Sequence, residues 1–403
     1  MQRVLVKQNR WIPTTPKKEN HVTAGLNYTS TNTVRSVLLR MTDSLMYSIA
    51  LTLVPGIGAV HARNLITAFN DSRYVFKASV SKLEKVEGIG QVRARNIKSF
   101  TDFERAEDEM RFIEKHHIRV LHITDDDYPK RLLHCDDAPL ILYYKGNATL
   151  NADKTVAVIG TRHNTMYGRQ VCESFVAALP EDVLVVSGLA HGIDSIAHKT
   201  ALKQHLQTVG VLGHGLDRIY PGQNRALAKQ MLDQGGLLTD FISNTKPDKE
   251  NFPKRNRVVA GMCDATVVIE SGLSGGSIIT ATLANSYNRD VFAFPGRTHD
   301  YFSEGCNELI RSHKAVLIRH TQDFLDWMNW NTPQPATPIQ RSLFPELSED
   351  EQRIAQRIQS SEVHIDDLND TGFTPGSLSA LLLSLEMKGW IISLPGKRYQ
   401  WLG

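Results

Sequence analysis

The sequence predicts an α/β protein built around a doubly wound, mainly parallel β-sheet, with a small helical domain before the sheet and a winged-helix domain after it. Short runs of Val, Ile, Leu and Ala alternate with helical stretches, which is the pattern of parallel strands covered by helices on both faces. Several of these runs end in glycine-rich turns, and the run 155–162 (TVAVIGTR) is central among them. We expect these turns to gather at one edge of the sheet and to hold phosphate groups there.

The strands and helices of the sheet domain follow one another in regular order. Strands are expected at 119–124, 139–146, 155–162, 183–190, 208–215, 236–241, 265–271, 290–296 and 315–320. Helices are expected at 167–179, 191–205 and 225–234, and again after Ser277. In sheets of this kind ligands bind beyond the carboxyl ends of the strands, where the strand order reverses.

An internal repeat lies in the predicted helical domain, residues 41–103. Residues 53–66 (LVPGIGAVHARNLI) are echoed 32 positions later by residues 85–98 (KVEGIGQVRARNIK). Each copy reads as a helix end, a Gly-Ile-Gly turn and a new helix, which is the helix-hairpin-helix pattern. Glycine permits the tight turn, and the amides that open the second helix can bind a nucleic-acid phosphate. Two interpretations stay open, namely a nucleic-acid contact and a helical domain whose hairpins only pack together.

The remaining segments frame these two domains. Residues 1–40 show no clear periodicity, and we expect a disordered extension or a start codon assigned too early. The sheet domain occupies 104–330, and the four prolines in 331–346 indicate a linker. Residues 347–403 combine a leucine-rich helix with two strands joined by a Pro-Gly-Lys turn. This is the pattern of a winged helix, a domain that binds duplex DNA or another protein.

The composition describes an ordinary globular chain. Net charge is only +3 and charged residues make up 22%, so a nucleic-acid partner has to be inferred from clustered cations rather than from bulk charge. The four cysteines lie far apart without a Cys-x-x-Cys pair, which favours reduced thiols in the cytoplasm over a disulfide scaffold or a zinc site. No apolar run approaches the ~20 residues that span a bilayer, and no signal peptide is visible, so we expect no membrane association.

Three short segments carry the residues of a candidate phosphate site. The first is the turn after the central strand, where a guanidinium can grip a phosphate through two hydrogen bonds. The second is a basic segment beside Phe252, expected to be a loop near the phosphate edge and suited to single-stranded nucleic acid. The third is a Gly/Ser loop that opens a helix, which is an anion site. The candidate binding residues are Gly160, Thr161, Arg162, Lys254, Arg255, Asn256, Arg257, Gly275, Gly276 and Ser277.

Other chemistry is less well supported. The sequence lacks a full Gly-x-Gly-x-x-Gly fingerprint after the central strand and has no Lys-Ser/Thr after the Gly/Ser loop, which disfavours NAD binding and ATP hydrolysis. His191, Asp194 and His198 lie near one face of a helix and resemble metal ligands. We favour a structural role for them, with Asp194 and His191 at the helix start and His198 packed inside, so no cofactor and no metal are expected.

The order of these motifs resembles the DNA-processing protein A (DprA/Smf) family. The resemblance covers roughly residues 105–320 and is carried by eight motifs in one order: GTR, SGLAHGID-SIAH, GVLGHGLDRIYPGQN, GGLLTDF, FPKRNRVVAG, SGGSIITATLAN, VFAFPG and EGCNELI. It implies a Rossmann-like fold that binds single-stranded DNA, loads RecA recombinase onto it in natural transformation and related recombination, and forms a homodimer. It also implies that Arg162 and residues 254–257 contact DNA phosphates, with donors from residues 275–277. Gly222 stands where the family often has a basic residue, so one contact is missing or is supplied by Lys254.

Two other functions stay open. A nucleotide phosphoribohydrolase shares a similar sheet and a glycine-rich phosphate loop, but its loop typically reads Pro-Gly-Gly-x-Gly-Thr followed by a glutamate, whereas this chain has Leu-Ser-Gly-Gly-Ser-Ile-Ile-Thr. A winged-helix regulator of transcription is compatible with the two flanking domains. We expect a binding protein rather than an enzyme, because no catalytic carboxylate pair or nucleophile elbow is apparent.

Overall fold

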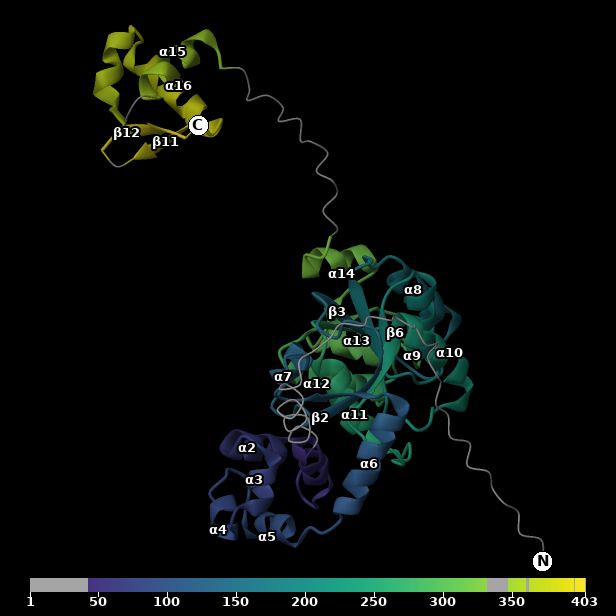
Figure 1. Cartoon of the computed structure of the whole chain (residues 1–403). Helices are drawn as coiled ribbons and strands as arrows, with labels where there is room; N and C mark the ends of the chain where they lie inside the picture. The colour runs from purple at the N-terminus through teal and green to yellow at the C-terminus, as the bar shows by residue number, and fades with distance from the viewer. Residues whose placement is uncertain (1–42, 332–346, 360–361, 395, 403) are drawn as a thin grey trace, which may run out of the picture. The chain divides into compact units, whose positions relative to one another are not determined.

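The computed structural model describes residues 43–331, 347–359, 362–394 and 396–402. The prediction for residues 1–40 therefore lies outside the described residues, as does nearly all of the predicted linker. The chain divides into two compact units, residues 1–330 and 331–403, and the helical repeat and the sheet belong to the same unit (Figure 1).

The centre of the first unit is a nine-stranded sheet with the order β1-β2-β6-β5-β4-β3-β7-β8-β9. Its strands are β1 (Arg119–His122), β2 (Ile141–Gly146), β3 (Lys154–Ile159), β4 (Val183–Ser187), β5 (Thr208–Val211), β6 (Gly235–Thr239), β7 (Ala265–Val268), β8 (Asp290–Ala293) and β9 (Val316–Leu317). The pairs β1–β2 and β2–β6 are antiparallel, and the other pairs are parallel. Each strand overlaps one predicted range, and the predicted doubly wound, mainly parallel sheet is confirmed.

The strand order reverses at β3. From β3 the chain proceeds through β4 and β5 to β6 on one side, and then returns to place β7, β8 and β9 on the other. The turns that leave β3 and β7 are therefore neighbours at the carboxyl edge of the sheet, which makes this the switch point where such folds bind ligands.

Helices cover both faces of the sheet. They are α6 (Phe103–His116), α7 (Lys130–Leu133), α8 (Met166–Ala177), α9 (Ile193–Lys203), the short η1 (Gly222–Asn224), α10 (Arg225–Gln234), α11 (Asn251–Gly261), α12 (Gly276–Ser286), α13 (Glu304–Arg311) and α14 (Thr321–Met328). Alternate residues of β3 face opposite ways, as a strand requires. Val156 and Val158 belong to a core with α8, α9 and α14, whereas Ala157 and Ile159 belong to a core with α11, α12 and α13.

One predicted loop is wrong. Residues 251–257 form the first two turns of α11, not a loop. Pro253 stands in the first turn, where the amides have no intrahelical acceptor, so the missing N–H of proline costs nothing. Val258 and Val259 are buried and fix the following turn in the core. The basic segment is therefore held by a rigid helix.

The internal repeat forms two helical hairpins that are joined by hydrogen bonds. The first runs from the helix at residues 43–53 into α2 (Ala59–Phe69), and the second from α4 (Val80–Leu83) into α5 (Gln91–Ser99), with α3 (Ser72–Lys77) between the two. The first glycine of each Gly-Ile-Gly turn, Gly56 and Gly88, has positive φ (81° and 78°), which explains why glycine is needed there.

The hydrogen bonds between the hairpins are reciprocal. Asn96 Nδ2 donates to the Pro55 carbonyl (2.9 Å), and Asn64, 32 residues earlier, donates to the Glu87 carbonyl (3.2 Å). Arg93 adds hydrogen bonds to the carbonyls of Gly56 and Gly88 (3.1 Å each). The side chains of one copy therefore satisfy the turn of the other.

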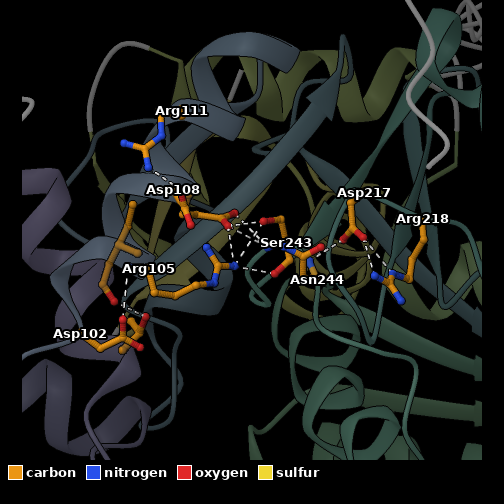
Figure 2. A network of polar contacts seen from close by, with 11 residues as sticks. Asp102, Arg105, Asp108, Arg111, Asp217, Arg218, Ser243 and Asn244 are labelled. Carbon is orange, nitrogen blue, oxygen red and sulfur yellow. Dashed lines mark hydrogen bonds and ion pairs between the residues drawn. The ribbon is translucent and has the colours of Figure 1, made fainter. Parts of the chain in front are cut away.

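A buried polar network joins α6 to two loops of the sheet (Figure 2). The Glu109 carboxylate is 1% exposed and accepts hydrogen bonds from the Ser243 amide (3.0 Å), the Ser243 hydroxyl (2.5 Å) and Arg105 (3.0 Å). The next residue, Asn244, donates its amide to Asp217 (2.9 Å). Asp217 lies in the loop after β5, so α6 fixes the loop that leads to Tyr220.

The second unit is a winged helix, as predicted. It contains α15 (Glu349–Ile358), β10 (Val363–His364), η2 (Ile365–Thr371), α16 (Pro375–Met387), β11 (Ile391–Leu394) and β12 (Arg398–Trp401), with the antiparallel strand order β10-β12-β11. Glu351 organises it from within, because its carboxylate closes a capping box with Ser348 and accepts two 2.7 Å hydrogen bonds from Lys388.

Candidate nucleic-acid interface

The turn after β3 is shaped by its neighbours at the switch point. The Thr161 amide donates to the Glu270 carbonyl (2.7 Å), and the Thr161 carbonyl accepts from the Ile193 amide (3.2 Å). A Cβ on Gly160 would lie 2.5 Å from Ile193 Cγ1 and 3.0 Å from the Glu270 carbonyl oxygen. Only glycine fits between Ile193 and the Glu270 carbonyl. The turn then places Arg162 at the surface as an exposed side chain.

The first helix after the central strand offers no anion site, because Glu270 occupies its N-terminus. The Glu270 carboxylate accepts from the Thr165 amide (2.9 Å) and the Thr165 hydroxyl (2.5 Å), and Thr165 in turn caps α8 through the Gly168 amide (3.1 Å). A Cβ at Gly168 would collide with that carboxylate. The position that holds the pyrophosphate in a dinucleotide-binding fold is therefore filled by a protein carboxylate.

The anion-binding features appear instead at the next strand, in the loop between β7 and α12. The helix starts at Gly276 after Gly275, with no side-chain cap from the described residues. The Gly275 and Ile278 amides donate to the carbonyls of Gly272 (3.2 Å) and Gly275 (3.0 Å), which leaves the amides of Gly276 and Ser277 for an anion. The Ser277 hydroxyl donates to Ser271 Oγ (2.7 Å), which donates to the Gly272 carbonyl (2.9 Å). A Cβ at Gly275 would lie 2.6 Å from Ser271 Oγ, so the loop is compact and its backbone is accessible.

An aromatic and cationic stack lies at the start of α11. The Arg162 guanidinium lies 5.0 Å from the centre of the Phe252 ring, and the Tyr220 ring lies 6.0 Å from Phe252 at an angle of 32°. A Cβ at Gly213 would approach Phe252 to 3.0 Å, so the ring is seated against backbone. Tyr220 is 47% exposed, so part of its ring is accessible to a ligand.

Arg255 is buried rather than presented to solvent. It is 4% exposed, and its guanidinium donates to the Gly188 carbonyl at 2.5 Å and to the Val211 carbonyl. Burial lowers its pKa to about 10, with the nearby Asp194 opposing that shift, while burial raises the pKa of Asp194. Arg255 thereby ties the ends of β4 and β5 to α11.

Its neighbours on α11 point in different directions. Lys254 is exposed. Asn256 donates from Nδ2 to the Gly276 carbonyl (3.4 Å), so it reaches the Gly/Ser loop. Arg257 turns away, because its guanidinium pairs with Asp240 (2.5 Å) and donates to the Asp137 carbonyl.

These groups line one cleft of about 880 Å³ at the carboxyl edge of the sheet. Eight of the ten predicted residues line it: Gly160, Thr161, Arg162, Arg255, Asn256, Gly275, Gly276 and Ser277. Lys254 and Arg257 do not. Sequence reasoning missed Tyr301 and Phe302, which line the same cleft. Two adjacent aromatics shortly after the strand at 290–296 were the available signal.

The alternative metal ligands are separated. His198 is fully buried and bonds Thr208 through Nδ1 (2.7 Å), and burial, assisted by the charge of Arg255, lowers its pKa to about 3. Asp194 accepts from the Ala190 amide (3.3 Å), whereas His191 is exposed. Within the described ranges no group of three His, Cys, Asp or Glu side chains could hold a metal ion. The four cysteines are buried and free.

The winged helix has little positive charge to offer a nucleic acid. Residues 347–403 contain eight acids and five bases. The leucine-rich helix α16 contains no Lys or Arg, and Leu383 (58%) and Met387 (82%) are exposed on it. Phosphate contacts require cations at such a helix, so these features do not favour a duplex-reading regulator. Among the described residues, no helix has the length and apolar character needed to cross a membrane.

The fold and the cleft define a class of protein, namely a Rossmann-like α/β protein with a cleft at its switch point, lined by Arg162 and the uncapped start of α12, while its dinucleotide position is closed by Glu270. The chain belongs to the DNA recombination-mediator protein A family, whose model matches residues 119–329, and residues 334–397 match the DprA winged helix domain. The predicted family is thereby confirmed.

Individual relatives agree with this assignment. Protein Smf of Synechocystis sp. is 31% identical over 88% of this chain and 98% of its own length. The X-ray structure of DNA processing protein A from Streptococcus pneumoniae is 31% identical, with a TM-score of 0.62, over 70% of this chain and 97% of its own. A structure of DNA processing protein A from Helicobacter pylori, described by its unique single-stranded DNA binding mode, is 30% identical, with a TM-score of 0.49, over 53% of this chain and 96% of its own.

Proposed function

We propose that this protein is a recombination mediator that binds single-stranded DNA in the cleft at the switch point, protects it and loads RecA recombinase onto it in natural transformation and related recombination. The observation that carries the proposal is the juxtaposition, across one cleft, of the Arg162–Phe252–Tyr220 stack and the uncapped start of α12. Amides and a guanidinium suit the backbone phosphates, and exposed aromatic faces suit unpaired bases.

Each candidate residue then has a role. Arg162 and the backbone amides of Gly276 and Ser277 contact phosphates. Gly275 and the Ser277 hydroxyl hold the loop in shape through Gly272 and Ser271, and Gly160 and Thr161 fix the turn that holds Arg162. Asn256 contacts the strand from α11. Lys254 is exposed between the cleft-lining residues Pro253 and Arg255 and supplies positive charge beside the cleft. Arg255 and Arg257 do not contact the strand but hold α11 in place, because their guanidinium groups are bonded to protein acceptors.

Substitution of Arg162 tests the site. Fluorescence anisotropy with a labelled poly-dT strand, titrated at several salt concentrations, gives both the affinity and its salt dependence. Arg162→Ala is expected to weaken binding and to reduce the slope of log K against log salt by about 0.7, the value for one phosphate contact to a single strand.

Arg169→Ala is the matched control, because Arg169 is an exposed arginine of α8 that does not line the cleft. Equal slopes for the wild type, Arg162→Ala and Arg169→Ala would refute the assignment of the site. Displacement of the strand by AMP, or base release from nucleoside monophosphates, would instead favour a phosphoribohydrolase.

The partners belong to the same proposal. We expect a non-enzymatic, cytoplasmic homodimer, and two apolar side chains near the free edge of the sheet support self-association: Leu317 on the edge strand β9 (44% exposed) and Trp327 on α14 (57% exposed). Sedimentation of the wild type and of Trp327→Glu tests the dimer. RecA-catalysed strand exchange on DNA coated with single-strand-binding protein tests loading, since a mediator shortens the lag and Arg162→Ala restores it.

A further inference from the structure

The lining of the cleft includes a second exposed aromatic ring. Tyr301 is 61% exposed and lies in the segment after β8, next to Phe302, with ring centres 5.0 Å apart at 79°. A Cβ at Gly272 would come within 3.2 Å of the Tyr301 ring. One edge of the ring therefore rests on the backbone of the Gly/Ser loop, and much of its surface faces the cleft and solvent.

The segment that carries Tyr301 is fixed to the phosphate loop by backbone hydrogen bonds. The Ser271 amide donates to the Phe302 carbonyl (2.6 Å), and the Gly305 amide donates to the Ser271 carbonyl (2.8 Å). The Ser303 amide closes the turn onto the Asp300 carbonyl (2.8 Å). The ring is thus held in place before any ligand arrives, which lowers the entropic cost of binding.

Tyr301 and Tyr220 follow strands that lie on opposite sides of the switch point at β3. Tyr220 follows β5 and Tyr301 follows β8, and the order β5-β4-β3-β7-β8 separates the two strands by four strand spacings, or roughly 19 Å. Stacked nucleotides rise by ~3.4 Å each, so a single strand that runs from the end of β5 to the end of β8 covers several nucleotides. The phosphate donors at Arg162 and the start of α12 follow β3 and β7, between the two rings in strand order.

We propose that Tyr301 is a second base-stacking platform, so that a single strand crosses the carboxyl edge of the sheet from Tyr220 to Tyr301 with its phosphates held between them. This inference rests on the proposed binding of single-stranded DNA at the cleft and adds the path of the strand. A continuous strand stacks on both rings while its phosphates are held between them, so two platforms favour a strand over a free nucleotide as ligand.

The test separates base contacts from phosphate contacts. Binding of poly-dT and of an abasic phosphodiester strand of equal length is measured for Tyr301→Ala, Tyr301→Phe and Arg162→Ala in the full chain. Loss of one stacked base is worth about 1–3 kcal/mol, so Tyr301→Ala should weaken poly-dT binding by about 5- to 150-fold. The same substitution should leave abasic-strand binding nearly unchanged, and Tyr301→Phe should bind like the wild type.

Tyr74→Ala is the matched control, because Tyr74 is a comparably exposed tyrosine (55%) on α3 in the helical hairpin region. Thermal unfolding of each variant verifies that the fold is retained. Equal poly-dT affinity of Tyr301→Ala and Tyr74→Ala, while Arg162→Ala still weakens both strands, overturns the second platform alone. No binding of poly-dT by the wild type, or no effect of Arg162→Ala on either strand, overturns the proposed function itself.

Discussion

Arg255 is the residue at which the sequence pattern and the structure suggest different roles, and its replacement distinguishes them. Its position in a basic run predicts a phosphate contact, whereas its guanidinium is buried and bonded to the Gly188 and Val211 carbonyls. We expect Arg255→Met to destabilise the first unit strongly and to affect DNA binding only through that loss.

The magnitude follows from the groups left without partners. Each buried carbonyl that loses its donor costs about 1–3 kcal/mol, and Asp194 loses the charge that opposes its own desolvation. Breaking a buried charged contact typically costs about 3–5 kcal/mol, which we take as the expected loss in the free energy of unfolding. Adding Asp194→Asn to Arg255→Met should recover part of this loss, since the unpaired carboxylate is then removed.

Urea unfolding followed by circular dichroism measures the effect, with Lys254→Met as the control at the adjacent exposed position. The control should stay within about 0.5 kcal/mol of the wild type. The reasoning is refuted if Arg255→Met is as stable as Lys254→Met and yet loses tenfold or more in affinity for poly-dT, because Arg255 would then be a direct ligand of the strand.

Three further predictions follow from buried groups. Desolvation opposes ionisation of Glu351, but its hydrogen bonds with Lys388, Ser384 and the Ser348 amide outweigh this effect and lower its pKa to about 2. Because folding lowers this pKa, the ionised carboxylate stabilises the folded state fully above pH 4.5. Up to about 3 kcal/mol of the free energy of unfolding is lost as pH falls toward 2. Hydrogen exchange in residues 347–402 should show that loss, and Glu351→Gln should abolish the pH dependence. Glu109→Gln should cost about 3 kcal/mol by weakening the buried pair with Arg105, whereas Glu107→Gln, at an exposed position of the same helix, should be neutral in urea unfolding. Gly160→Ala should cost about 1–3 kcal/mol, because its Cβ would overlap Ile193, while Gly222→Ala, with nothing within 4 Å, should leave the melting temperature unchanged.

Much of the fold could be predicted because its signals are local. The strands are short apolar runs bounded by turn residues, and the Gly-Ile-Gly turns need positive φ at Gly56 and Gly88, so composition and spacing are sufficient to find them. The Gly/Ser loop was identified for the same reason, since its glycines immediately precede α12.

The parts that were missed depend on contacts between distant segments. The start of α11 shows no apolar periodicity, and its helical anchor, Val258 and Val259, comes only after the basic run. The burial of Arg255 is determined by carbonyls at positions 188 and 211, which only the folded sheet brings to it. Tyr301 joins the cleft because its segment pairs with Ser271, 30 residues earlier, and no local pattern encodes that pairing.

The reciprocal hydrogen bonds make the stability of each hairpin depend on the presence of the other. Asn64 and Asn96 each satisfy a carbonyl in the turn of the other copy, so neither copy contains all the donors that its own turn requires. A single hairpin would leave those carbonyls to water. Each copy therefore stabilises the turn of the other, and deletion of either copy removes the exchanged bonds of both. An insertion between the copies is tolerated more easily, because lengthening a loop adds only a small entropic cost and leaves the exchanged bonds intact.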